Sequence, residues 1–81
     1  MDNLYIMGIL VDTRKKSAPK VQEILTQYGD SILSRFGVHD PGEEEHGLIT
    51  LSVRDKEERL DTMLLELEHL DGVTAKLVQM K

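Results

Sequence analysis

Hydrophobic and polar residues along the chain follow two different periods, and each change of period marks a new element. Residues 4 to 11 form an apolar run rich in branched side chains, which is typical of a strand. Apolar residues then recur at helical spacing between Ser17 and Gly29, with Pro19 where it suits a first helical turn. Strand-like patterns return over residues 32 to 38 and 47 to 54, on either side of a turn at Pro41 and Gly42.

The last third of the chain continues with one more helix and one more strand. Asp55 and Glu58 have the spacing of a capping box, which predicts a helix start, and Gly72 predicts the end of that helix. Residues 73 to 80 alternate as a final strand. The sequence therefore predicts a single α+β domain over residues 1–81 with a ferredoxin-like β-α-β-β-α-β fold. Its four-stranded antiparallel sheet would carry both helices on one face, with the first and third strands in the middle.

The first predicted strand is apolar on both of its faces. Tyr5, Met7, Ile9 and Val11 point one way, whereas Leu4, Ile6 and Leu10 point the other. Because two helices cover only one face of such a sheet, the other set needs a further cover. We expect a second copy of the chain to supply it, in a homodimer or homotetramer, and we take Tyr5 and Met7 as candidate interface residues. The alternative is a few singly exposed apolar side chains, which small domains commonly carry.

Size and composition narrow the classes of function. A chain of 81 residues without cysteine has a thin core and neither disulfides nor thiolate metal sites to strengthen it, which also favours an oligomer. The formal net charge of −5 disfavours direct nucleic-acid binding. The apolar start is too short to span a membrane and lacks the features of a signal peptide, so we expect a cytoplasmic protein with no membrane partner.

No residue pattern indicates an enzyme. The serines have no histidine in a recognisable nucleophile motif, and the acidic runs at residues 43–45 and 57–58 fall in a turn and a first helical turn, where carboxylates are solvated. His39 and His46 bracket the acidic turn, but their spacing matches no metal-site signature, and a solvated hairpin is the simpler interpretation. We therefore expect no catalytic residue, no cofactor and no metal.

One basic cluster stands out in this acidic chain. Arg14, Lys15 and Lys16 lie between the first strand and the first helix, beside a helix N-terminus that can attract an anion. A solvated loop is the plainer interpretation. If the protein binds a small-molecule effector, we expect Arg14 and Lys15 to lie near it, at a boundary between subunits.

Several short segments resemble a known family of small regulators of the iron-only hydrogenase system, whose fold is similar to ACT-type and nickel-repressor ligand-binding domains. The segments are Ser34-Arg35-Phe36-Gly37-Val38, Gly47-Leu48-Ile49 and Leu70-Asp71-Gly72-Val73. The resemblance covers nearly the whole chain and adds Arg35 and Gly37 to the candidate effector or interface residues. It implies a regulatory domain without its own DNA-binding segment.

Two departures limit what the resemblance implies. In such families the Arg-x-Gly motif is followed closely by a proline, whereas here His39 and Asp40 precede Pro41. The nickel ligands of the repressor domains include a cysteine, which this chain lacks, so nickel binding is not implied. Two hypotheses follow: a homo-oligomeric regulator that senses a small-molecule effector, or an accessory factor that docks onto a protein partner without a small ligand.

Overall fold

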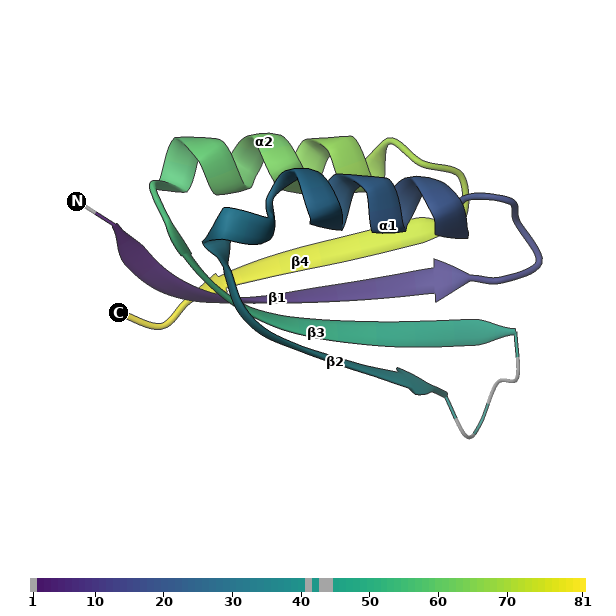
Figure 1. The fold of residues 1–81 in the computed structure, drawn as a ribbon. Helices are drawn as coiled ribbons and strands as arrows, with labels where there is room; N and C mark the ends of the chain where they lie inside the picture. Colours follow the sequence, from purple (N-terminus) through teal and green to yellow (C-terminus); the bar gives the residue numbers. More distant parts are fainter. Residues whose placement is uncertain (1, 41, 43–44) are drawn as a thin grey trace.

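The structure is a computed structural model that describes residues 2–40, 42 and 45–81. Its elements follow the predicted order β-α-β-β-α-β, with one turn of 3-10 helix after the first α-helix (Figure 1). The bounds are β1 Asn3–Asp12, α1 Ala18–Gln27, the 3-10 turn Gly29–Ser31, β2 Ile32–His39, β3 His46–Asp55, α2 Glu57–Glu68 and β4 Val73–Gln79. The turn residues Pro41, Glu43 and Glu44 lie outside the described residues.

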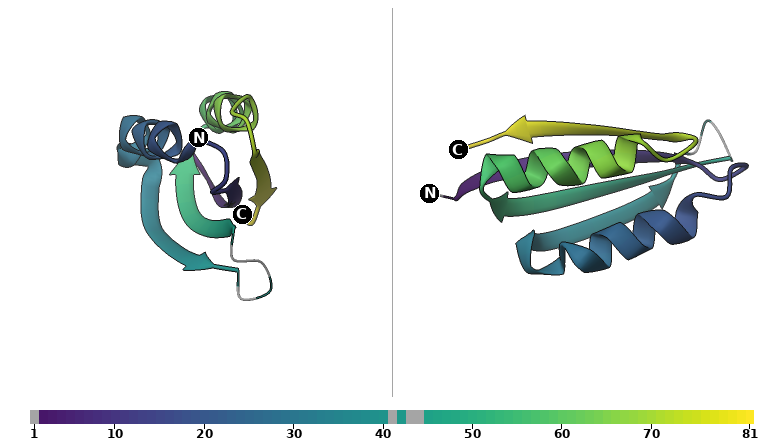
Figure 2. Two further views of the ribbon diagram at one scale, coloured as in Figure 1. Left: turned by 90° about the vertical axis from the view of Figure 1, so that its right-hand side faces the viewer. Right: turned by 90° about the horizontal axis from the view of Figure 1, so that it is seen from above.

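The four strands form one antiparallel sheet in the order β2-β3-β1-β4, so the first and third strands are central as predicted. Both helices pack on the same face, and no described helix or strand covers the opposite face (Figures 1 and 2). This is the ferredoxin-like arrangement that the sequence pattern predicts. As far as the described residues go, neither helix is long and apolar enough to cross a membrane.

The core lies between the sheet and the helices. The odd-numbered residues of β1 face the helices and contact the apolar stripes of α1 and α2, together with Leu51 and Val53 of β3. Leu60, Met63 and Leu67 supply the buried stripe of α2, and Val21 and Leu25 that of α1. Each fully buried side chain of this size stabilises the fold by about 1.5–3 kcal/mol, so these positions dominate the folding energy of a small domain.

The prediction that Tyr5 and Met7 are interface residues is wrong for this arrangement. Their side chains are only 2% and 0% exposed, because they belong to the set on β1 that the helices cover. The apolar side chains without a cover are the even-numbered ones, among them Ile6 and Leu10. Sequence could not decide between the two sets, since both are apolar.

The predicted capping box at the start of α2 does not form. Lys56 is the N-cap and no side chain caps the helix. Asp55 instead accepts hydrogen bonds from Ser31 and from Arg59, whose Nη1 lies 2.6 Å from the Asp55 carboxylate. Arg59 also pairs with Asp30 at 3.1 Å and stacks over the Tyr28 ring at 4.9 Å from its centroid. The first turn of α2 is thus tied to the segment that leads from α1 into β2.

Gly72 makes the turn from α2 into β4. It has φ of +75°, and it alone among the described residues has a positive φ. A Cβ at this position would lie 2.6 Å from Cγ of Lys15 and 3.2 Å from Cβ of Asp12. The backbone carbonyl of Gly72 also accepts a hydrogen bond of 2.8 Å from the Asp12 amide. Both the backbone conformation and the close approach therefore require glycine.

Replacing Gly72 with alanine should lower the free energy of unfolding by about 1–2 kcal/mol, because alanine pays a left-handed backbone penalty and crowds Lys15. Urea denaturation followed by circular dichroism would measure it. Gly29→Ala is the matched control, since a Cβ there has no neighbour within 4 Å. Equal stability of the two variants would show that the turn is not constrained as described.

Candidate functional site

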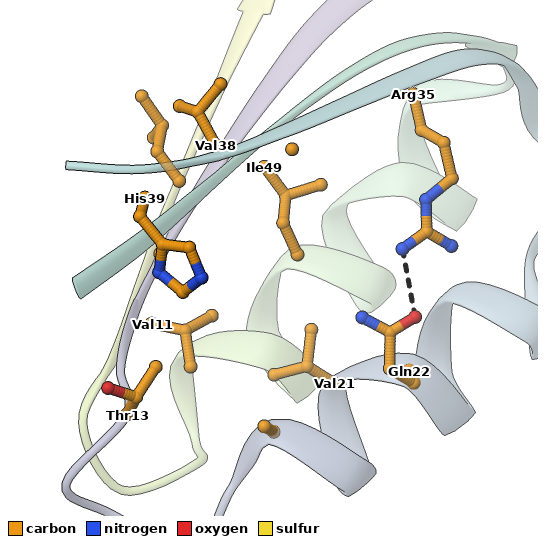
Figure 3. Close-up of a pocket in the computed structure, with 12 residues that line it drawn as sticks. Val11, Thr13, Val21, Gln22, Arg35, Val38, His39 and Ile49 are labelled. Atoms are coloured by element: carbon orange, nitrogen blue, oxygen red, sulfur yellow. Dashed lines mark hydrogen bonds between the residues drawn. The ribbon is translucent and has the colours of Figure 1, made fainter. Parts of the chain in front are cut away.

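A pocket of about 290 Å³ lies on the helix side of the sheet, between α1 and the ends of β2 and β3 (Figure 3). Its floor is apolar, and its polar groups come from Arg35, Gln22, Thr13 and His39. The lining residues are Val11, Thr13, Ala18, Val21, Gln22, Arg35, Gly37, Val38, His39, Gly47, Leu48 and Ile49. An apolar concavity with a few polar groups is the usual form of a small-molecule site.

Strand alternation explains which side chains of β2 enter the pocket. Gly37 pairs with Ile49, and Arg35 pairs with Leu51, so both share the helix-facing side of the sheet. The Arg35 guanidinium extends toward α1, where its Nη2 donates a hydrogen bond of 2.9 Å to Oε1 of Gln22 (Figure 3). Arg35 and His39 lie toward opposite ends of the pocket, with Val21 and Ile49 between them (Figure 3).

Of the residues proposed from sequence, the structure brings Arg35 and Gly37 together in the pocket and places Arg14 and Lys15 elsewhere. Arg14 folds back on Asp12, with its Nε and Nη2 at 3.0 and 2.9 Å from the two carboxylate oxygens. Lys15 packs against Gly72. The basic loop therefore serves the end of β1 and does not line the pocket.

The Asp12 carboxylate is the most strongly perturbed acid of the described chain. Hydrogen bonds from the side chain and the backbone amide of Arg14 lower its pKa to about 2, against a partial opposing effect of burial. Its carboxylate is therefore ionised at any physiological pH and holds Arg14 in place. We assign this pair a structural role at the loop between β1 and α1.

The Arg59 cluster defines a second electrostatic centre at the opposite end of the helices. The Ser31 hydroxyl, followed by Arg59 and the Lys56 amide, lowers the pKa of Asp55. Asp55 and Asp30 raise the pKa of Arg59. Burial, and then a 3.1 Å hydrogen bond to Glu66, raises the pKa of Tyr28. The side chains of Tyr28, Asp30, Ser31, Asp55 and Arg59 all hydrogen-bond within this cluster or to Glu66, so we assign it to stability.

His39 and His46 do not converge on a common cation. His39 pairs with Gly47 and faces the pocket, whereas His46 pairs with Asp12 on the opposite side of the sheet. Within residues 2–40, 42 and 45–81, no group of three or more histidine or acidic side chains is placed to hold a metal ion.

Gln22, Thr13 and Ala18 line the pocket, although no motif in the sequence marks them as site residues. Gln22 reads as an ordinary exposed helix position, and only its place opposite Arg35 gives it a role. Gly47 was noted for the family resemblance alone. A weak signal was available in the small residues at helix-facing positions of adjacent strands, because alternation puts Gly37 and Gly47 where side chains would otherwise fill the space.

The face of the sheet opposite the helices is the second candidate surface, and we call it the open face. The described apolar side chains on it are Leu4, Ile6, Leu10, Phe36, Val38, Leu48 and Val78. Phe36 and Val78 are 68% and 55% exposed, which is high for large apolar side chains on a sheet. Gly8 lies among them, and a Cβ there would meet nothing within 4 Å. Thr50, Ser52 and Lys76 share this face, so the apolar side chains form a mixed surface, and its exposed Phe36 and Val78 make it a candidate interaction site.

The fold defines the class of protein first: this is a ferredoxin-like domain with an ACT-like arrangement of its helices and sheet. It resembles the regulatory subunit of aspartate kinase from Thermus flavus, at 18% identity and a TM-score of 0.66, over 94% of this chain and 51% of that one. It also resembles CPII, a nitrogen regulatory PII-like protein from Thiomonas intermedia whose structure holds ADP, AMP and bicarbonate. That match has 14% identity and a TM-score of 0.54, over 100% of this chain and 97% of the other.

The family is more specific. Residues 3–77 match the model of the TM1266-like family, described as "Iron-only hydrogenase system regulator, putative", and the chain belongs to this family. The structure of the uncharacterized protein TM1266 from Thermotoga maritima is 28% identical, covers 100% of both chains and superposes with a TM-score of 0.91. No curated protein sequence matches the chain. The resemblance noted from the hairpin and glycine segments is thus confirmed.

Acid should destabilise the protein through Asp12 and Asp55. Both have a pKa below the ordinary value in the folded state, so each contributes stability that is present above its ordinary pKa and is lost as the pH falls; for Asp12 the loss extends to about pH 2. Urea denaturation between about pH 5 and pH 2 would show this decline. Asp55→Asn should have a shallower decline than the unmodified protein. An identical acid dependence of the two would contradict the role given to the Arg59 cluster.

Proposed function

We propose that this protein is a cytoplasmic regulatory domain that senses a small-molecule effector and self-associates through its open face. The observation that carries the proposal is the geometry of β2. Its odd-numbered residues Arg35 and Gly37 line the pocket, while the side chain of Phe36 between them lies on the open face. The single strand β2 thus contributes side chains both to the pocket and to the open face. A regulator needs such a shared element if ligand binding is to change its assembly.

A second copy of the chain is the cover that we propose for the open face. The domain has a small core and no disulfide, so burying this surface against a copy would add the apolar contact that a single copy lacks. Face-to-face packing of two sheets at about 10 Å is a common solution for such surfaces. Phe36 is the most exposed aromatic on the face, and aromatic side chains often dominate interface energies.

The family supports a regulatory role linked to the iron-only hydrogenase system rather than catalysis. The proposal assigns no catalytic residue, metal or cofactor to the chain. It also assigns no direct contact with nucleic acid, because the net charge of −5 opposes a phosphate backbone. Any effect on transcription would then require a protein partner that reads DNA.

Native mass spectrometry at micromolar concentration should show a homodimer or homotetramer, together with any retained small-molecule mass. Phe36→Glu should weaken the association by at least about tenfold, because it buries a carboxylate in the apolar contact. Leu65→Glu is the matched control, since Leu65 on α2 is also 68% exposed and lies away from the open face.

A monomeric unmodified protein would overturn the self-association proposal and favour the alternative, in which a different protein covers the open face without a small ligand. Equal effects of Phe36→Glu and Leu65→Glu would place the interface elsewhere. Circular dichroism of both variants would establish that each remains folded.

A further inference from the structure

The pocket exists because three lining positions carry little or no side chain. Gly37 and Gly47 occupy helix-facing positions on β2 and β3, and Ala18 lies at the first turn of α1. A Cβ at Gly37 would meet nothing within 4 Å, and one at Gly47 would come no nearer than 4.0 Å to the Val38 carbonyl. Glycine weakens a strand, so its presence at Gly37 without any steric need for it keeps space open.

Among the described lining residues, Arg35 alone carries a permanent positive charge. In the part of the chain that the structure describes, it forms no ion pair with a carboxylate. Its hydrogen bond to Gln22 uses Nη2 and holds the guanidinium over the pocket. A guanidinium has five N–H donors in a planar fork, so it retains donors suited to bind a carboxylate through two parallel hydrogen bonds.

Carboxylates are absent from the described lining, although the chain has 15 acidic residues against 10 basic ones. An ammonium group placed here would face Arg35 and would have no carboxylate to pair with. Between these groups the walls are aliphatic, formed by Val11, Val21 and Ile49. At about 290 Å³ the space suits a small molecule rather than a nucleotide.

We propose that the pocket binds a small aliphatic monocarboxylate through Arg35 and discriminates against the corresponding amino acid and amine. The carboxylate pairs with the guanidinium, and the aliphatic body lies on the floor beside Gly37. Discrimination arises because an ammonium group would lie next to the like-charged guanidinium, and no described lining residue offers it a carboxylate. This inference rests on the proposed function in naming the class of its effector.

Three molecules with the same branched body separate the contributions of charge. Isocaproate carries the carboxylate alone, leucine carries a carboxylate and an ammonium, and isoamylamine carries the ammonium alone. Each would be titrated into ¹⁵N-labelled full-length protein while the backbone amide signals are followed. Isocaproate should shift the amides of Gly37, Gly47 and Ala18 in a saturable way, leucine should bind at least about tenfold more weakly, and isoamylamine should leave these signals unchanged.

Two variants test the assigned contacts. Arg35→Gln should weaken isocaproate binding by about tenfold or more, because it removes a charge-assisted pair of hydrogen bonds. Gly37→Val should abolish binding by filling the floor, and the fold should tolerate it because the added Cβ has open space in a strand. Arg54→Gln and Gly29→Ala are the matched controls, since Arg54 is exposed on β3 outside the pocket and a Cβ at Gly29 also meets open space.

Equal or tighter binding of leucine or isoamylamine would overturn the proposal, as would isocaproate binding that survives both Arg35→Gln and Gly37→Val. No saturable shift with any of the three molecules would overturn it too. These outcomes are independent of assembly. Isocaproate binding to a protein that stays monomeric would sustain the pocket and reject the proposed function, whereas an oligomer that binds none of the three would reject the pocket alone.

Discussion

Two helices are too narrow to cover a four-stranded sheet, and most of what is distinctive in this protein follows from that limit. The helices bury the central strands β1 and β3, while residues 33 to 39 of the edge strand β2 remain exposed on both faces. β2 is held mainly by its backbone pairing with β3. On its helix side the incomplete cover leaves a pocket, and on its other side β2 continues the open face.

An edge strand held in this way is a physically reasonable element for coupling two sites. A ligand that draws Arg35 or Gly37 toward α1 would tilt β2 and move Phe36 and Val38, because successive residues of a strand are rigidly linked. Coupling free energies in such systems are about 1–3 kcal/mol, and they act in both directions. Association through the open face would therefore change affinity in the pocket by the same factor that the ligand changes association.

Much of the fold could be predicted from periodicity, because the helical stripe through Leu60, Met63 and Leu67 and the alternation of β3 are strong local signals. The predictions that failed concerned contacts between segments that are distant in the sequence. Asp55 has the spacing of a local capping box, yet its carboxylate accepts a hydrogen bond from the hydroxyl of Ser31, which lies 24 residues away. For the site, the resemblance drew attention to Arg35 and Gly37, but no local pattern could place Gln22 opposite them.

The register shift between Ile32 and Ser34 decides what each face of β2 presents. Ile32 pairs with Val53 and Ser34 with Ser52, so Leu33 is an extra residue relative to β3, as in a β-bulge. If the same residues paired without this register shift, Arg35 and Gly37 would point to the open face, and Phe36 would point toward the helices. A regular register over the same residues would therefore exchange the chemistry of the two surfaces: an arginine would lie on the open face, and a phenyl ring would lie in the pocket. The irregularity at the start of β2 thus sets the composition of the pocket and of the open face at once.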